Sequence, residues 1–174
     1  IIEDAGYEFT ALHAEFKIAL NSYLKALIHS PVKTLADVIR FNNKHPDLEK
    51  TDKYDQDVML AAEKTKGIGK KEEEAIAILA YLSKNGIEKV MKVNKLDALV
   101  TSGFDFATVL AIGGYPGITV PAGYNDGSPI GICFSGLRGS EPTLIQIAYS
   151  FEQATKLRRP PPPITHKSFR YINR

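Results

Sequence analysis

Apolar side chains near the start of the chain recur every three or four residues, the spacing of one face of an α-helix. Between residues 7 and 28 this stripe comprises Phe9, Leu12, Phe16, Leu20, Tyr23 or Leu24, and Leu27. The pattern predicts one helix over residues 7–28. The helix is expected to stop there because Pro31 pushes the residue before it, Ser30, out of the α region.

Capping signals predict a second helix directly afterwards. Thr34 suits the N-cap position, and Asp37 places an acid at the third helical position, as in a capping box. The pair predicts a short helix that ends at His45 and Pro46.

Three more helical stretches are predicted before residue 96. Glutamates at residues 72–74 fall in the first turn of a helix over residues 70–84, where the helix dipole favours acids. Residues 85–86, Asn-Gly, are predicted to cap its C-terminus. Residues 55–64 and 87–94 are predicted to form shorter helices.

After residue 96 the pattern changes to short apolar runs. Residues 96–100, 118–122 and 130–134 are predicted strands, and the dense turn residues 125–129 predict a hairpin between the last two. The first run is expected to be a buried parallel strand because it follows a helix. A helix over residues 141–157 is expected to pack over the sheet. The chain is therefore predicted to be α/β, with a sheet covered by helices.

Charge distribution weighs against a nucleic-acid protein. The 174 residues carry a net charge of +2, but the first 155 contain 16 Lys and Arg against 20 acids. Only the tail is basic, whereas a nucleic-acid binder presents basic residues over a face of its folded body. No apolar run has the length of a membrane span. The first residues, Ile-Ile-Glu-Asp, are neither a signal peptide nor an initiator Met, and upstream sequence is expected; the cellular compartment stays open.

Several short motifs have an ordinary structural interpretation beside a functional one. Residues 67–69, Gly-Ile-Gly, suggest a phosphate loop or a DNA-binding hairpin of helices, but three glutamates follow, and an inter-helix turn is favoured. The prolines at 160–163 suit either a polyproline ligand or a stiff exit from the domain, and the exit is favoured. Cys133 is alone and is expected to be buried.

Catalytic groups are missing from the sequence. Ser102 and Ser135 each precede a glycine, but no His or Lys beside them could serve as a base. The four histidines lack metal-ligand spacing. Neither a metal site nor a cofactor is predicted.

Residues 113–123, GGYPGITVPAG, combine four glycines and two prolines around a short apolar strand. Glycine admits backbone angles and close approaches that a Cβ forbids, and proline fixes the strand's ends. The stretch is either a surface turn or an element that shapes a cavity.

A series of segments in the second half of the chain resembles the C-terminal part of the amidase signature family. The segments are residues 96–100, 110–123 and 127–136, Glu141, and the helix AYSFEQA at 148–154. Earlier stretches, EFK at 15–17, LNSYL at 20–24 and LADVIRFN at 35–42, look like its plant and microbial amidase branch, so the resemblance extends over residues 7–160. Members hydrolyse amides with a Ser–cis-Ser–Lys triad on a large mixed sheet wrapped by helices. The triad's Gly/Ser-rich signature and lysine are absent here.

The resemblance implies what this chain contributes. Residues 1–159 would be the C-terminal part of an amidase domain, with a helical segment at 7–94, a strand-rich segment at 96–136 and the closing helix; residues 160–174 would be a Pro-rich, basic tail. The substrate would be a small-molecule amide. Gly113, Gly114 and Tyr115 would form part of the cavity wall, and Asp105 would help to bind substrate.

Two functions from different classes follow. The first is a C-terminal fragment of an amidase-signature hydrolase whose triad lies upstream. The alternative is a truncated, non-catalytic interaction protein with the amidase fold. Because a sheet cut from its neighbours leaves apolar faces uncovered, a bare apolar surface is expected near residues 96–100 and 118–120. The oligomeric state stays open.

Overall fold

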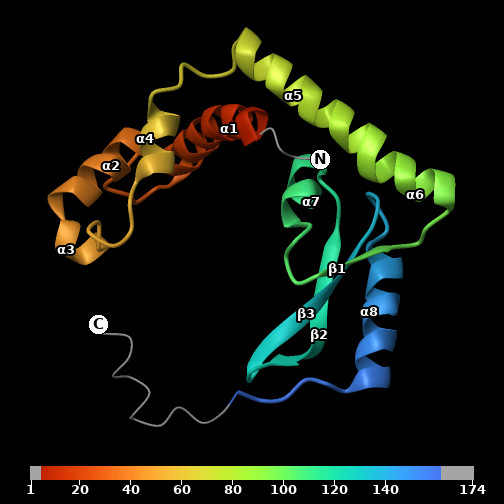
Figure 1. Ribbon diagram of the computed structural model, residues 1–174. Coiled ribbons are helices and arrows are strands. Elements are labelled where there is room, and N and C mark those ends of the chain that lie inside the picture. The colour runs from red at the N-terminus through yellow and green to blue at the C-terminus, as the bar shows by residue number, and fades with distance from the viewer. Residues whose placement is uncertain (1–4, 162–174) are drawn as a thin grey trace. The chain divides into compact units, whose positions relative to one another are not determined.

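The computed structural model describes residues 5–161, which fall into two compact units divided between Gly86 and Ile87. The first unit is helical (Figure 1). Its helices are α1 (Ala5–Ala26), α2 (Leu35–Lys44), α3 (Pro46–Glu49), α4 (Asp57–Glu63) and α5 (Lys70–Ser83). Helix α1 begins and ends two residues before the predicted range, and α2, α4 and α5 lie where capping and periodicity place them.

A small apolar core joins three helices of the first unit. Leu35 and Ile39 of α2 and Ala62 of α4 are buried together, and apolar side chains of α1 and α4 pack against them: Phe16, Leu20 and Met59. Two residues of the apolar stripe predicted for α1, Phe16 and Leu20, therefore pack in this core. Fully burying a side chain such as Leu35 contributes roughly 1.5–3 kcal/mol.

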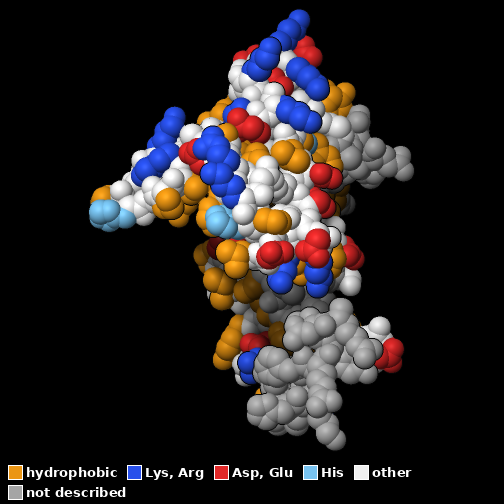
Figure 2. Space-filling view, turned by 90° about the vertical axis from the view of Figure 1, so that its left-hand side faces the viewer, with side chains coloured by type: hydrophobic (Ala, Val, Ile, Leu, Met, Phe, Trp, Pro, Cys, Tyr) orange, Lys and Arg blue, Asp and Glu red, His pale blue; other side chains and the backbone are white. Residues whose placement is uncertain are grey.

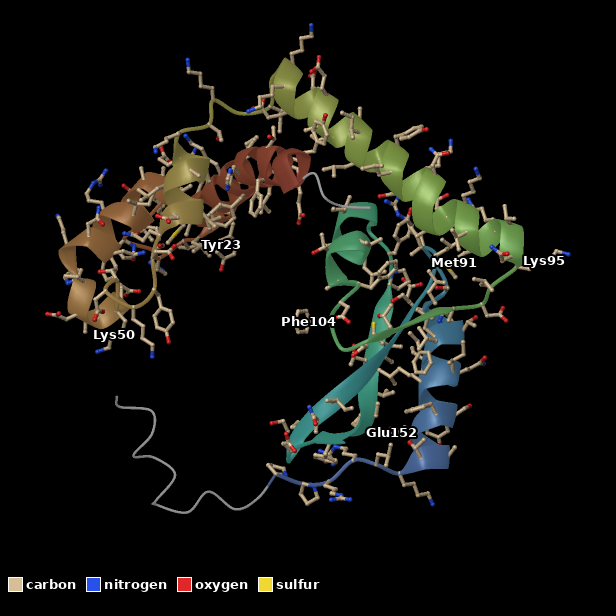
Figure 3. All side chains as sticks on the ribbon, viewed as in Figure 1. Tyr23, Lys50, Met91, Lys95, Phe104 and Glu152 are labelled. Carbon is tan, nitrogen blue, oxygen red and sulfur yellow. The ribbon has the colours of Figure 1, made fainter. Side chains whose placement is uncertain are left out.

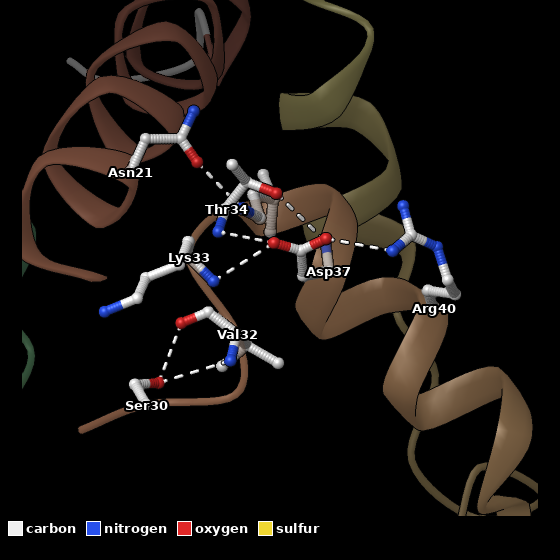
Figure 4. A network of polar contacts seen from close by, with 8 residues as sticks. Asn21, Ser30, Val32, Lys33, Thr34, Asp37 and Arg40 are labelled. Atoms are coloured by element: carbon white, nitrogen blue, oxygen red, sulfur yellow. Dashed lines mark hydrogen bonds and ion pairs between the residues drawn. The ribbon is translucent and has the colours of Figure 1, made fainter. Parts of the chain in front are cut away.

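The start of α2 is the capping box that its sequence predicts (Figure 4). The Asp37 N–H donates to Thr34 Oγ1 at 3.1 Å, and the Thr34 N–H donates to Asp37 Oδ2 at the same distance. The Lys33 N–H also donates to Asp37 Oδ2, and Arg40 Nη1 lies 2.9 Å from Oδ1. These donors, led by the Lys33 N–H, hold the pKa of Asp37 below its ordinary value.

The predicted C-cap at residues 85–86 is wrong. The helical backbone continues from α5 through a π-helical turn, η1 (Lys84–Glu88), into α6 (Lys89–Asn94). Gly86 does not adopt a positive φ, so it does not end the helix as a left-handed glycine would. Such a π turn buries Ile87 and presents Glu88 from the same short segment.

The second unit is built on a three-stranded sheet. Its elements after α6 are β1 (Leu99–Ser102), α7 (Ala107–Gly113), β2 (Gly117–Asn125), β3 (Ser128–Ser135) and α8 (Glu141–Thr155). The strand order is β1-β3-β2, and both pairings are antiparallel. The α/β class is confirmed, but the parallel pairing expected for residues 96–100 is wrong. Strands β1 and β2 do run in the same direction, joined through α7, yet β3 lies between them.

The predicted hairpin is confirmed. Strands β2 and β3 pair from Gly117–Ser135 to Asn125–Ser128, with an irregularity between Pro121 and Gly123. The turn uses Asp126 and Gly127, both with positive φ, as expected of a two-residue hairpin turn.

Each face of the sheet has its own core. On one face α8 buries Leu144 and Ala148 against Phe134, and Ile118, Val120 and Ile132 pack around them. This confirms that the closing helix covers the sheet (Figure 1). The expected bare surface is only partly present, because Ile118 and Val120 are half-buried while Val100 on β1 is 55% exposed.

The other face is closed by a second cluster. It contains Leu110 of α7, Tyr115, and Ile87 and Met91 from η1 and α6. Leu99 of β1 packs against this cluster, whereas its neighbour Val100 pairs with Phe134. The alternation is that expected of a β-strand, whose successive side chains point to opposite faces of the sheet.

Three helices end at a lysine in the left-handed conformation. Lys50 after α3, Lys95 after α6 and Lys156 after α8 have φ values of 53°, 50° and 50°. Figure 3 labels Lys50 and Lys95 at these ends. A non-glycine residue is uncommon in this region, but a cation suits a helix C-terminus.

We expect Thr34→Ala to lower the free energy of unfolding by about 1 kcal/mol, because the Asp37 N–H loses its cap. Chemical denaturation of the chain measures the effect. Thr51→Ala is the matched control, since the Thr51 hydroxyl makes no hydrogen bond within the described residues. Equal midpoints for the two variants would contradict the capping role.

Candidate functional site

Helix α7 ends in a turn that uses both glycines of the predicted cavity wall. The Gly114 N–H donates to the Ala111 carbonyl at 3.3 Å and the Tyr115 N–H donates to the Leu110 carbonyl at 2.9 Å, a Schellman ending. Gly114 has φ 64°, which that ending requires. At Gly113 a Cβ would collide with the Tyr115 ring. The two glycines are thus needed for different reasons, a backbone angle and a close approach.

Arg138 holds this turn from the connection that follows β3. Its Nε and Nη2 both donate to the Gly113 carbonyl, at 3.1 and 2.6 Å. Its guanidinium carbon lies 5.9 Å from the centroid of the Tyr115 ring, within cation–π range. Two residues before Arg138, the Gly136 N–H donates to the Pro116 carbonyl at 3.1 Å. Backbone and side chain of the connection therefore both contact residues 113–116.

Tyr115 is anchored at its other end by Glu88. The Tyr115 hydroxyl donates to Glu88 Oε1 at 2.9 Å, and Lys92 Nζ lies 2.6 Å from Glu88 Oε2. Tyr115 is only 8% exposed. Burial, reinforced by the Glu88 carboxylate, raises the pKa of Tyr115 to about 12. At neutral pH the phenol is therefore a proton donor, and Glu88 is its acceptor.

Small polar side chains lie on the α7 side of the sheet. Ser135 is fully buried and Cys133 is 7% exposed, with Ser135 Oγ 3.6 Å from Cys133 Sγ. The burial predicted for Cys133 is confirmed. Thr101, which pairs with Cys133 across the strands, has a buried Oγ1 without a hydrogen-bond partner among the described residues. Ser135, Cys133 and Thr101 include no base that could activate a nucleophile.

Asp105 lies apart from the 113–115 turn. It is exposed in the turn between β1 and α7, and its N–H donates to the Ser102 carbonyl at 3.2 Å. The length of α7, about 10 Å at 1.5 Å per residue, separates it from Gly113. Its neighbour Phe104 is 85% exposed, and Figure 3 shows that side chain projecting from the turn. The sequence does not single out Phe104.

The other sequence motifs have structural roles in the described part of the chain. The Gly69 N–H donates to Glu72 Oε2 at 3.0 Å, so a carboxylate occupies the helix start where a phosphate would have to approach. On the face drawn in Figure 2, cationic and anionic side chains are interspersed. Within residues 5–161 no cluster of His, Cys, Asp and Glu could hold a metal ion. His166 lies outside the described residues, as do residues 162–163 of the proline run.

No helix in the described part of the chain is both long and apolar enough to cross a membrane.

Comparison with known proteins identifies this architecture. A probable amidase of Arabidopsis thaliana is 57% identical over 159 residues, 91% of this chain and 31% of that protein. The peptide amidase of Stenotrophomonas maltophilia matches with a TM-score of 0.82 and 34% identity, over 92% of this chain and 36% of that one. An amidase family protein from Bacillus anthracis matches with a TM-score of 0.79 and 34% identity, over 89% of this chain and 30% of that one. No family model matches.

The fold is therefore that of an amidase, as the peptide amidase match shows. The chain belongs to the amidase signature family, and the resemblance found in the sequence is confirmed. The chain spans about a third of the length of the Arabidopsis and Stenotrophomonas relatives.

The candidate site combines residues that the sequence indicates with residues that it does not. Gly113, Gly114 and Tyr115 form one turn, and Asp105 stands at the opposite end of α7. The sequence does not single out Arg138 or Glu88. It does show Arg138 in a Gly-Leu-Arg-Gly stretch after a predicted strand, but nothing in that stretch points to a carbonyl 25 residues earlier.

The ionisation of Tyr115 gives a pH test. Because its native pKa of about 12 exceeds the ordinary 10.0, the neutral phenol stabilises the fold fully below pH 10, and this contribution is lost as the pH rises towards 12. We expect the difference in unfolding free energy between wild type and Tyr115→Phe to be constant up to pH 10 and then to shrink. Denaturation at increasing pH measures it, with Tyr149→Phe as the exposed control. A difference that stays constant to pH 12 would contradict the shift.

Proposed function

We propose that this chain is the C-terminal part of an enzyme that hydrolyses small-molecule amides. The observation that carries the proposal is 57% identity to a probable amidase along 91% of this chain, while the match covers only 31% of that relative. A complete amidase of this kind would thus include a further, larger stretch of polypeptide. The peptide amidase match, at 34% identity, supports the same activity class.

The described residues indicate which part of the enzyme this chain would supply and which part would lie upstream. Acyl transfer needs a nucleophile, a base and oxyanion donors in one geometry. Ser135 is buried beside Cys133, with no base next to it among the described residues, and Ser102 is exposed at the end of β1. The Ser–cis-Ser–Lys triad would therefore come from polypeptide upstream of Ile1.

Residues 1–159 would contribute sheet, helical cover and one wall of the substrate cavity. Gly113, Gly114 and Tyr115 would form that wall, because Arg138 is hydrogen-bonded to their turn, which carries no side chain at its first two positions. Asp105, exposed before α7, would offer a carboxylate to a polar group of the substrate. Residues 160–174 would be a tail.

We expect the 174-residue chain alone to release no ammonia from simple acyl amides, and the polypeptide extended upstream to release it. Sequencing upstream of Ile1 should reveal a Gly/Ser-rich run with a lysine some tens of residues earlier. An ammonia assay on both purified proteins makes the comparison.

Turnover by the chain alone would overturn this division, provided that it survives stringent purification and separate replacement of Ser102 and Ser135 by alanine. If an extended polypeptide that carries the triad releases no ammonia from a panel of amides, the proposal that the protein is a hydrolase is wrong. The alternative, a non-catalytic interaction protein, would then be the better proposal.

A further inference from the structure

The turn at residues 113–115 is held from two sides by segments distant in sequence. Arg138 reaches the Gly113 carbonyl and the Tyr115 ring from the connection between β3 and α8. Glu88 holds the Tyr115 hydroxyl from the π turn before α6. Two segments of the second unit, distant from each other in sequence, therefore converge on three consecutive residues.

The turn needs such external support because its own residues are permissive. Gly113 and Gly114 lack side chains, and glycine loses more backbone freedom on ordering than any other residue. The two Schellman hydrogen bonds fix the end of α7, but they leave the direction of the Gly113 carbonyl and of the Tyr115 ring to other contacts.

Arginine suits this role better than lysine would. Its guanidinium presents several donors in a fixed plane, so Nε and Nη2 can both donate to one carbonyl oxygen while the cation lies near an aromatic ring. Here both nitrogens donate to the Gly113 carbonyl, and the guanidinium carbon lies 5.9 Å from the centroid of the Tyr115 ring. Arg138 is itself exposed, so its charge loses little hydration and its removal leaves no buried unpaired charge.

We propose that Arg138 is a positioning residue of the amidase, which sets the shape of the cavity wall at residues 113–115 through the Gly113 carbonyl and the Tyr115 ring. The inference rests on the proposed function, since it takes the turn to be that wall. Arg138 touches neither substrate nor reacting atoms in this scheme; it acts through the turn.

A simpler role for Arg138 is that of a charged C-cap of α7, which would matter for stability alone. The two roles differ in what they predict. A cap affects the unfolding transition, whereas a positioning residue changes substrate binding at temperatures where the protein is fully folded.

The test uses the polypeptide extended upstream, with Arg138→Ala, Arg138→Lys and, as matched control, Arg158→Ala, an exposed arginine beyond α8. We expect Arg138→Ala to raise KM about 10-fold with kcat within about twofold of wild type, because the wall and not the reacting groups is displaced. Arg138→Lys should recover part of the loss, since an ammonium can donate to the Gly113 carbonyl but cannot bind it with two donors. Arg158→Ala should match wild type.

Amide hydrogen exchange at Tyr115 provides a readout without activity. We expect its N–H, which donates to the Leu110 carbonyl, to exchange about 10-fold faster in Arg138→Ala, as the turn opens locally. Unchanged KM in Arg138→Ala would overturn the proposal, and so would a KM change that follows the fraction of unfolded protein. An inactive wild type would overturn the proposed function, and the exchange rate would then decide separately whether Arg138 holds the turn.

Discussion

The second unit depends on the pairing of β3 between β1 and β2. The register that sets Gly117 opposite Ser135 also brings residue 136 beside residue 116, where the Gly136 N–H meets the Pro116 carbonyl. Two residues later Arg138 is within reach of the turn after α7. A shift of one residue would exchange the two faces of β3, moving Phe134 out of the α8 core and Cys133 into it. The register thus determines both cores and the site.

The elements that the sequence predicts well are those with local signals. The Thr34–Asp37 capping box, the hairpin turn at residues 126–127 and the stripe of α8 all depend on residues near one another in the chain. The order and direction of the strands in the sheet could not be predicted from local signals. An apolar run after a helix indicates a buried strand, but its partner is chosen by segments 30 residues away, and β3 inserts itself between two strands that run in the same direction.

The missed features share a physical cause. Helix α7 is seven residues long and has no polar N-cap bond, so its only clear signal is the glycine pair that ends it. The π turn depends on burying Ile87 among Met91, Leu110 and Tyr115, a tertiary effect that outweighs the Asn-Gly stop signal. Arg138 and Glu88 act through contacts across 25 and 27 residues. The candidate wall was indicated by the family resemblance and the glycines, while the groups that hold it emerged only from the fold.

The lysines that end α3, α6 and α8 show that the chain is not at its most stable. A left-handed conformation costs a residue with a Cβ roughly 1–2 kcal/mol, and glycine would avoid most of that cost. Lys50, Lys95 and Lys156 adopt the conformation nonetheless, and all three are exposed. Replacing any of these lysines by glycine would therefore be expected to raise the free energy of unfolding. The three positions lie outside the 113–115 turn. Proteins selected only to exceed a threshold of stability commonly leave such gains in stability unused.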